Sequence, residues 1–225
     1  MRARKRQERT EEILATAMQI LVDGGSPALT MRALAKSLSL TPGAVYRYFD
    51  GKDAIISALA LRTMSRYSEA LNQREQQARQ QSRDLPETHR DLFVLLARAL
   101  CYWELSVADP SGRTLINFIM NRQEQVLTQD AHDRFVAAVS VQLQRFAALC
   151  DATVAAGAMR PGNSFQRSLV CLSLVHGNLQ QIKLANTSPI PFESVEIMQM
   201  GLDSVLIGWG VEAAHLKALW PLVKE

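Results

Sequence analysis

The sequence has little of what marks several large classes of protein. Its three cysteines, Cys101, Cys150 and Cys171, are widely spaced and odd in number, which argues against a disulfide framework. Each lies in an apolar helical context and is predicted to be a small buried hydrophobe in a reducing compartment. No uninterrupted apolar run approaches the ~20 residues of a membrane span, and no apolar segment follows the basic amino terminus to make a signal peptide. We therefore expect a cytoplasmic protein with no membrane partner.

Motifs of catalysis and metal binding are equally scarce. The four histidines are scattered, and none has a metal-ligand partner at a recognised helical spacing (His89, His132, His176 and His215). The densest polar cluster, residues 130–133, stands at a predicted helix start, where acidic residues commonly cap. Because nucleophile elbow, phosphate loop and paired zinc ligands are all missing, we expect no enzyme, no metal and no cofactor. A helical enzyme remains the remote alternative.

What the chain does have is an ordinary globular composition with an uneven charge distribution. Apolar residues make up 48% and charged residues 21% of the 225 positions, which argues against disorder. Residues 1–52 hold nine Lys or Arg against five Asp or Glu, whereas the remainder holds 16 basic and 17 acidic residues. Positive charge is therefore concentrated at the amino-terminal end, as binding to a phosphate backbone requires.

The periodicity of the sequence predicts an all-α fold. Glycine and proline punctuate long amphipathic stretches, and no convincing strand pattern appears. Outside residues 30–52 the predicted helices span about 10–22, 53–80, 87–107, 113–127, 130–156, 164–185 and 192–210, with a short turn over 213–220. Residues 24–27, Gly-Gly-Ser-Pro, are expected to end the first of these helices.

Residues 30–52, TMRALAKSLSLTPGAVYRYFDGK, are the most informative stretch. Thr30 is a suitable N-cap for a short helix, and residues 37–40 form a tight turn. Thr41 then caps a second helix that begins at Pro42, where a missing N–H costs nothing. Apolar side chains recur at helical spacing on one face of both helices (Met31, Leu34, Ala35, Leu38, Val45 and Phe49). The outer face is polar and aromatic, so the stretch predicts a helix-turn-helix, which places its second helix in the major groove of DNA.

This stretch resembles the bacterial tetracycline-repressor (TetR) family of transcriptional regulators. The matching residues are Leu29-Thr30-Met31-Arg32, Leu34-Ala35, Leu38, Val45-Tyr46, Phe49 and Gly51-Lys52-Asp53-Ala54-Ile55. The resemblance is strong over residues 10–60, and beyond them only the helical pattern agrees. Ser39 departs from the glycine that the family commonly has in the turn, and a left-handed backbone there would cost serine roughly 1 kcal/mol. The resemblance implies a helix-turn-helix DNA-binding domain over 1–52 and an all-helical ligand-sensing and dimerisation domain over 53–225.

The resemblance also implies which residues meet DNA. Tyr46 and Tyr48 match aromatic phosphate contacts, Lys52 matches a phosphate contact at the start of the next helix, and Arg32 matches a position that can reach a base edge. The full set of expected DNA contacts is Thr30, Arg32, Thr41, Pro42, Gly43, Tyr46, Arg47, Tyr48 and Lys52. For two of these residues an alternative without a DNA-binding role stays open: Tyr48 could be a partly buried core aromatic, and Arg32 could be a solvated surface charge. The basic segment 2–6 could reach an adjacent minor groove or stay disordered.

The carboxyl-terminal part is expected to pair two copies of the chain. One helix-turn-helix contacts few bases, so a specific site needs two copies on a pseudo-palindrome. Two helical stripes are candidates for a four-helix dimer interface (Leu169, Leu172, His176, Leu179 and Gln180; Met198, Leu202, Val205 and Trp209). The alternative is that these stripes belong to the core of a single chain.

A small-molecule pocket is expected between the central helices. Aromatic side chains with a few polar groups suit such a pocket, and the candidate residues are Tyr102, Trp103, Asn117, Phe118, Met120, Phe146 and His176. The alternative is plain helical core. The sequence thus predicts a dimeric repressor that binds a double-stranded operator and is released by a small-molecule effector. A DNA-binding repressor that senses no small molecule, being constitutive or controlled by a protein partner, is the alternative.

Overall fold

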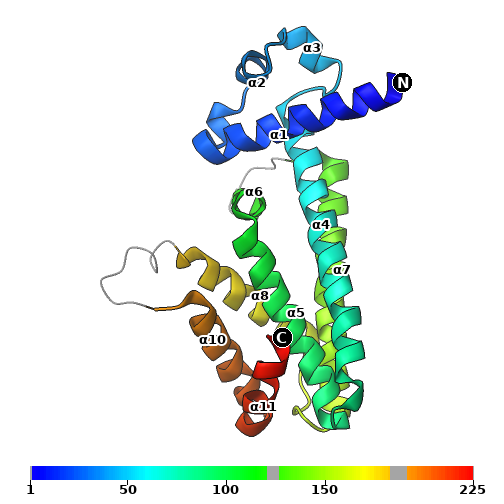
Figure 1. The fold of residues 1–225 in the computed structure, drawn as a ribbon, viewed down its shortest axis with the longest axis vertical. Helices are drawn as coiled ribbons and strands as arrows, with labels where there is room; N and C mark the ends of the chain where they lie inside the picture. The colour runs from blue at the N-terminus through cyan, green and yellow to red at the C-terminus, as the bar shows by residue number, and fades with distance from the viewer. Residues whose placement is uncertain (1, 121–126, 183–191, 225) are drawn as a thin grey trace. The chain divides into compact units, whose positions relative to one another are not determined.

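The computed structural model describes residues 2–120, 127–182 and 192–224, and its regular elements there are helices, which confirms the predicted all-α fold (Figure 1). The helices are α1 (Arg2–Ala28), α2 (Met31–Ser37), α3 (Pro42–Tyr46), α4 (Lys52–Gln81), α5 (Glu87–Ala108), α6 (Pro110–Met120), α7 (Gln129–Ala155), α8 (Ser164–Gln180), α10 (Ser194–Gly208) and α11 (Ala213–Val223). A 3₁₀ turn, η1 (Ser82–Asp84), follows α4. Within these described ranges, no helix combines the length and the apolar content needed to cross a membrane.

The helices group into two compact units. The first comprises residues 1–66 and 109–138, and the second comprises residues 67–108 and 139–225. The first unit therefore contains α1, α2, α3 and α6 with the opening turns of α4 and α7. The functional division at residue 52 stays a prediction, since the units are defined by packing alone.

The first unit is built around the amphipathic face of α1. Ile13, Ala17 and Leu21 recur three to four residues apart and are at most 2% exposed, as the 3.6-residue period of a helix requires for a core-facing stripe. Leu34 of α2 and Ile55 of α4 are fully buried in the same unit and add to its core. Because α2 and α3 are too short to be stable alone, this core is what holds the helix-turn-helix in place.

Helix α1 differs from the prediction at both ends. It begins at Arg2 rather than near residue 10, because charged side chains on its first turns pair along the helix: Arg4 Nε lies 2.8 Å from Glu8 Oε1. At the other end Gly25 adopts φ 68° and ψ −176°, a backbone conformation that glycine tolerates and that breaks the helical path. The expected stop at residues 24–27 is thus a kink inside the segment Arg2–Ala28.

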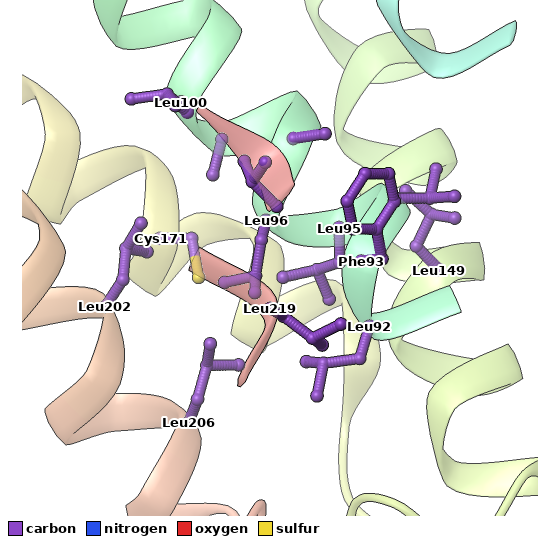
Figure 2. Packing of buried hydrophobic residues seen from close by; sticks show 14 of the residues in the cluster. Leu92, Phe93, Leu95, Leu96, Leu100, Leu149, Cys171, Leu202, Leu206 and Leu219 are labelled. Atoms are coloured by element: carbon purple, nitrogen blue, oxygen red, sulfur yellow. The ribbon is translucent and has the colours of Figure 1, made fainter. Parts of the chain in front are cut away.

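The second unit is organised around α5, which is buried on nearly all sides from Leu92 to Cys101. Figure 2 shows part of the hydrophobic cluster that α5 forms with α7, α8, α10 and α11. The labelled residues are Leu92, Phe93, Leu95, Leu96 and Leu100 of α5, and Leu149, Cys171, Leu202, Leu206 and Leu219 of the other four helices. A helix that is apolar all round must be surrounded by other helices. This explains why α5, rather than a surface helix, is the centre of the unit.

The three cysteines are free and buried, which confirms the expectation that they act as small hydrophobes. Burial raises the pKa of the Cys101 thiol to about 11 and those of Cys150 and Cys171 to about 12. They therefore remain protonated thiols at neutral pH, and their low thiolate content makes them poor nucleophiles.

Candidate nucleic-acid interface

The first helix of the motif begins as the sequence predicts. Thr30 has an extended backbone (φ −125°, ψ 154°), and its hydroxyl oxygen accepts a hydrogen bond from the backbone N–H of Ala33 at 3.0 Å. Such an N-cap satisfies one of the donors that a helix start leaves unpaired. Leu34 and Ala35 then point into the core of the unit, with at most 1% exposure. The opposite side of α2, including Arg32 and Lys36, is exposed.

The turn between the two helices closes as a Schellman motif around Ser39. The N–H of Leu40 donates to the carbonyl of Ala35 at 2.8 Å, and the N–H of Ser39 donates to that of Lys36 at 3.1 Å. Ser39 has φ 55°, and it is the non-glycine residue with a positive φ in the described part of the chain. The backbone at Ser39 is therefore left-handed, the conformation whose steric cost for serine the sequence raised as a question. It places a strained serine where glycine would fit without steric cost.

The second helix, α3, presents its outer face to solvent. Thr41 caps it by accepting from the N–H of Ala44 at 3.3 Å, Pro42 occupies its first turn, and Val45 is completely buried. Tyr46, by contrast, is 51% exposed although it is a large aromatic residue. An ideal Cβ built on Gly43 has no atom within 4 Å, so the fold itself does not require glycine there.

The nine expected DNA contacts divide into two groups. Seven of them lie in α2 and α3 or cap these helices, and all seven are exposed: Thr30, Arg32, Thr41, Pro42, Gly43, Tyr46 and Arg47. We call this set the DNA face. Tyr48 and Lys52 are half-buried. The Lys52 ammonium donates to the backbone carbonyl of Ser26, at the end of α1, so part of its hydrogen-bonding capacity serves the fold.

One neighbour of this face was missed in the sequence. The guanidinium carbon of Arg6 lies 5.9 Å from the ring centroid of Tyr48, within cation–π range. The available signal was helical spacing, because Arg6 precedes the buried residues Ile13 and Ala17 by seven and eleven positions and so shares their side of α1. Since segment 2–6 is helical, the expectation that it might be disordered is wrong.

The expected ligand residues do not fall in one unit. Tyr102, Trp103, Phe146 and His176 belong to the second unit, whereas Asn117, Phe118 and Met120 belong to the first. Within the second unit, Tyr102 Oη and His176 Nε2 are 2.5 Å apart, and the Trp103 indole N–H donates to Asn178 at 2.6 Å. Burial lowers the pKa of His176 and raises that of Tyr102, so both are neutral at pH 7.

The second unit also contains a cavity of about 370 Å³ between α10 and α11. Trp220 is buried at its wall and donates its indole N–H to Asp203 at 2.7 Å, and Lys217 lies on the same cavity. None of the seven expected ligand residues lines it.

The expected dimer stripes need correction. Met198 and Leu202 are fully buried and Leu179 is 6% exposed, so contacts within one chain already cover them and leave no surface for a second chain. Leu172, His176, Val205 and Trp209 are half-buried, while Leu169 and Gln180 are exposed. The exposed apolar residues on α8 and α10 are Phe165, Leu169 and Val170, and Met200 and Ile207. Periodicity therefore did not indicate which side of α8 and α10 faces outward, and the use of these helices in a dimer stays a prediction.

Comparison with known proteins identifies the amino-terminal module. Residues 13–59 match the family of bacterial regulatory proteins called the tetR family. The HTH-type transcriptional regulator Rv1816 of Mycobacterium tuberculosis is 26% identical over 119 residues, which are 51% of this chain and 47% of that protein. The chain thus matches about half the length of its curated relatives.

Solved structures share the fold of almost the whole chain. A bacterial regulatory protein in the tetR family from Rhodococcus RHA1 is similar with a TM-score of 0.71 and 18% identity, over 90% of this chain and 97% of that one. The complex of SmeT with triclosan is similar with a TM-score of 0.64 and 19% identity, over 92% and 93% of the two chains. The segment that matches the tetR family of bacterial regulatory proteins thus contains the capped helix-turn-helix, and the solved structures share the fold of the chain beyond it.

Proposed function

We propose that this regulator binds a pseudo-palindromic operator as a homodimer, represses transcription there, and is released by a small molecule bound to its carboxyl-terminal part. It acts by binding alone, without catalysis. The observation that carries the proposal is the DNA face: a capped two-helix motif, held by a buried core, exposes a tyrosine, two arginines and a glycine with open space above it.

The DNA face supports distinct roles for its members. Arg32 is exposed on α2, and an arginine fork can donate two hydrogen bonds to the O6 and N7 of guanine. Tyr46 presents a hydroxyl that can donate to a phosphate oxygen, which fixes position without reading sequence. Gly43 allows a close approach of the backbone of α3 to the duplex. Together these contacts would read one half-site.

A dimer is supported by the apolar residues that α8 and α10 leave exposed. Phe165, Leu169 and Val170 are 41–45% exposed, and Met200 and Ile207 are 59% and 45% exposed. Monomeric proteins rarely leave large contiguous apolar patches open to water, so these two helices suit an interface with a second copy. Two copies would present two DNA faces, as a pseudo-palindrome requires.

Two observations support the proposal that the chain binds an effector. The second unit has polar contacts in its interior, Tyr102 with His176 and Trp103 with Asn178, and its fold is similar to that of SmeT, which was solved with triclosan. A ligand can release DNA only through different affinities for the DNA-bound and free conformations. The alternative is a repressor with no small-molecule ligand. Thermal unfolding with a panel of hydrophobic and cationic compounds separates the two, because a ligand that binds the native state raises the midpoint with its concentration.

The proposal is tested by a genome-wide DNA pull-down with the purified protein, followed by titration of the enriched duplex. We expect enriched sites with two half-sites of opposite orientation and saturation at two chains per duplex. Enrichment of sites with a single half-site and one chain would contradict the dimer. Absence of any enriched duplex would contradict DNA-binding regulation itself.

A further inference from the structure

The first turns of α1 lie outside the matched family module yet adjoin the DNA face. Residues 2–12, which we call the arm, precede the matched segment 13–59 and continue α1 without a break in its helical path. Within the arm, Arg6 approaches the ring of Tyr48, which directly follows the DNA face in sequence. The arm is therefore a rigid extension of the same unit that carries the helix-turn-helix.

Charge is distributed unequally around the arm. Arg4 pairs with Glu8 at 2.8 Å, and Arg9 pairs with Glu12 at 2.6 Å. Among the ion pairs of the described residues none involves Lys5 or Arg6, although both are exposed. At 100° per residue, Arg6 lies on the core-facing side of α1 and Arg4 on the far side. Lys5 lies 100° from each of them, so the two cations of the arm that no carboxylate of the described residues pairs with, Lys5 and Arg6, span an arc of α1 that begins at the side toward Tyr48.

We propose that Lys5 and Arg6 bind phosphates of duplex DNA flanking the bases that α3 reads. The inference rests on the proposed function and extends its contact surface. A helix with its side chains is about 10–12 Å wide, whereas the minor groove of B-DNA is about 6 Å wide, so a helical arm cannot enter that groove. It can lie along the sugar–phosphate backbone instead, where each cation displaces condensed counterions regardless of base sequence.

Arg6 also acts as a positioning residue for Tyr48. The guanidinium of Arg6 lies over the half-buried ring of Tyr48, and the Tyr48 hydroxyl makes no hydrogen bond to another of the described residues. A ring held on one side keeps that hydroxyl in a fixed direction, which lowers the conformational entropy lost on binding a phosphate. Arg6 thus contributes a phosphate contact of its own and preorganises a second one.

The test is the salt dependence of duplex binding by the full-length protein. Each lost phosphate contact reduces the slope of log K against log salt by about 0.9, so Lys5→Ala/Arg6→Ala should flatten it by about 1.8 on specific and random duplexes alike. Arg4→Ala is the matched control, since it removes an equal charge from the far side of the same helix. Its slope should equal that of the wild type.

Three outcomes are decisive. A double variant with the wild-type slope, or an Arg4→Ala slope reduced as much per charge, overturns the arm as a contact while leaving the proposed function intact. Wild-type protein that binds no duplex refutes the proposed function and the inference together. The positioning role predicts that Arg6→Ala and Tyr48→Phe are non-additive, with the combined fold-loss in affinity smaller than the product of the single losses. Strictly multiplicative losses overturn it.

Discussion

An ion pair on the surface of the first unit, Arg62 with Glu11, has both side chains about half exposed, whereas Arg98 of the second unit is only 3% exposed. Arg98 donates to Glu75 at 3.0 Å, to the carbonyl of Leu71 at 3.2 Å, and to Gln142. The second unit thus uses a charged group to fasten α4, α5 and α7 to one another. The first keeps its charges in water, where they remain available to a partner.

A second buried cation repeats this pattern. Arg167 is 7% exposed, and its guanidinium donates to the carbonyl of Arg160 at 2.9 Å and lies 5.2 Å from the ring centroid of Trp209. It holds the segment after α7 against the end of α10. Buried charges are tolerated only when their hydrogen bonds are satisfied, so the loss of one partner is expensive. The comparison therefore predicts that equal substitutions have unequal effects in the two units.

The largest expected effect is on stability in the second unit. Arg98→Ala removes the most buried of the three arginines that pair with Glu75, together with the donor to Leu71 and Gln142, and should lower the free energy of unfolding by about 3 kcal/mol, measured by urea denaturation. The matched substitution in the first unit, Arg62→Ala, breaks an exposed pair and should cost at most about 1 kcal/mol. Equal losses for the two variants would show that burial does not distinguish the two sets of charges.

The next effect is on sequence preference. Arg32→Ala should relax discrimination at one base pair in each half-site by about 1–3 kcal/mol, because a bidentate arginine contact to guanine would be lost. Binding of the variant to a library of operator mutants measures this. Lys36→Ala, which removes an exposed cation one helical turn further along α2, is the control and should leave the preference unchanged. An identical base preference for wild type and Arg32→Ala would remove Arg32 as a reader.

A smaller effect is expected from Tyr46→Phe. The substitution removes a phosphate hydrogen bond worth about 0.5–1.5 kcal/mol and should weaken binding to operator and random DNA by the same factor. Because Tyr46 is 51% exposed, the variant should keep its thermal stability. Fluorescence anisotropy with both duplexes gives the two affinities. An unchanged affinity for both duplexes would contradict the phosphate role.

The smallest effect is a gain in stability from Ser39→Gly. Glycine adopts the left-handed conformation of the turn without steric cost, and we expect the unfolding free energy to rise by about 0.5–1 kcal/mol. Ser37→Gly, two residues earlier in the last helical position of α2, should instead destabilise by about the same amount. A loss of stability with Ser39→Gly would mean that the turn is not strained.

The comparison of the two units also explains what the sequence could and could not predict. Thr30, Thr41 and Pro42 act on backbone groups within three residues, so their roles as caps and helix start were readable from local sequence and are confirmed. The contact of Lys52 with Ser26 joins residues 26 apart, and nothing in local spacing indicates it. Its use in the fold was therefore missed.

In the second unit, periodicity identified apolar faces but not what covers them. Met198 and Leu202 lie on a genuine helical stripe, yet that stripe packs inside one chain, and the exposed apolar side of α10 carries Met200 and Ile207 instead. Likewise, Tyr102 and Asn117 were grouped by residue type, although they belong to different units. Long-range packing decides such assignments, and a single sequence does not contain it in readable form.

The central claim is that the exposed outer side of the helix-turn-helix binds duplex DNA through several phosphates and a few base edges. Its most direct test is titration of an enriched operator duplex and a random duplex over a range of salt concentrations. The account predicts tighter binding to the operator and a steep loss of affinity with salt, by about 0.9 in log–log slope for each phosphate contact. Failure to bind any duplex at low salt would contradict it.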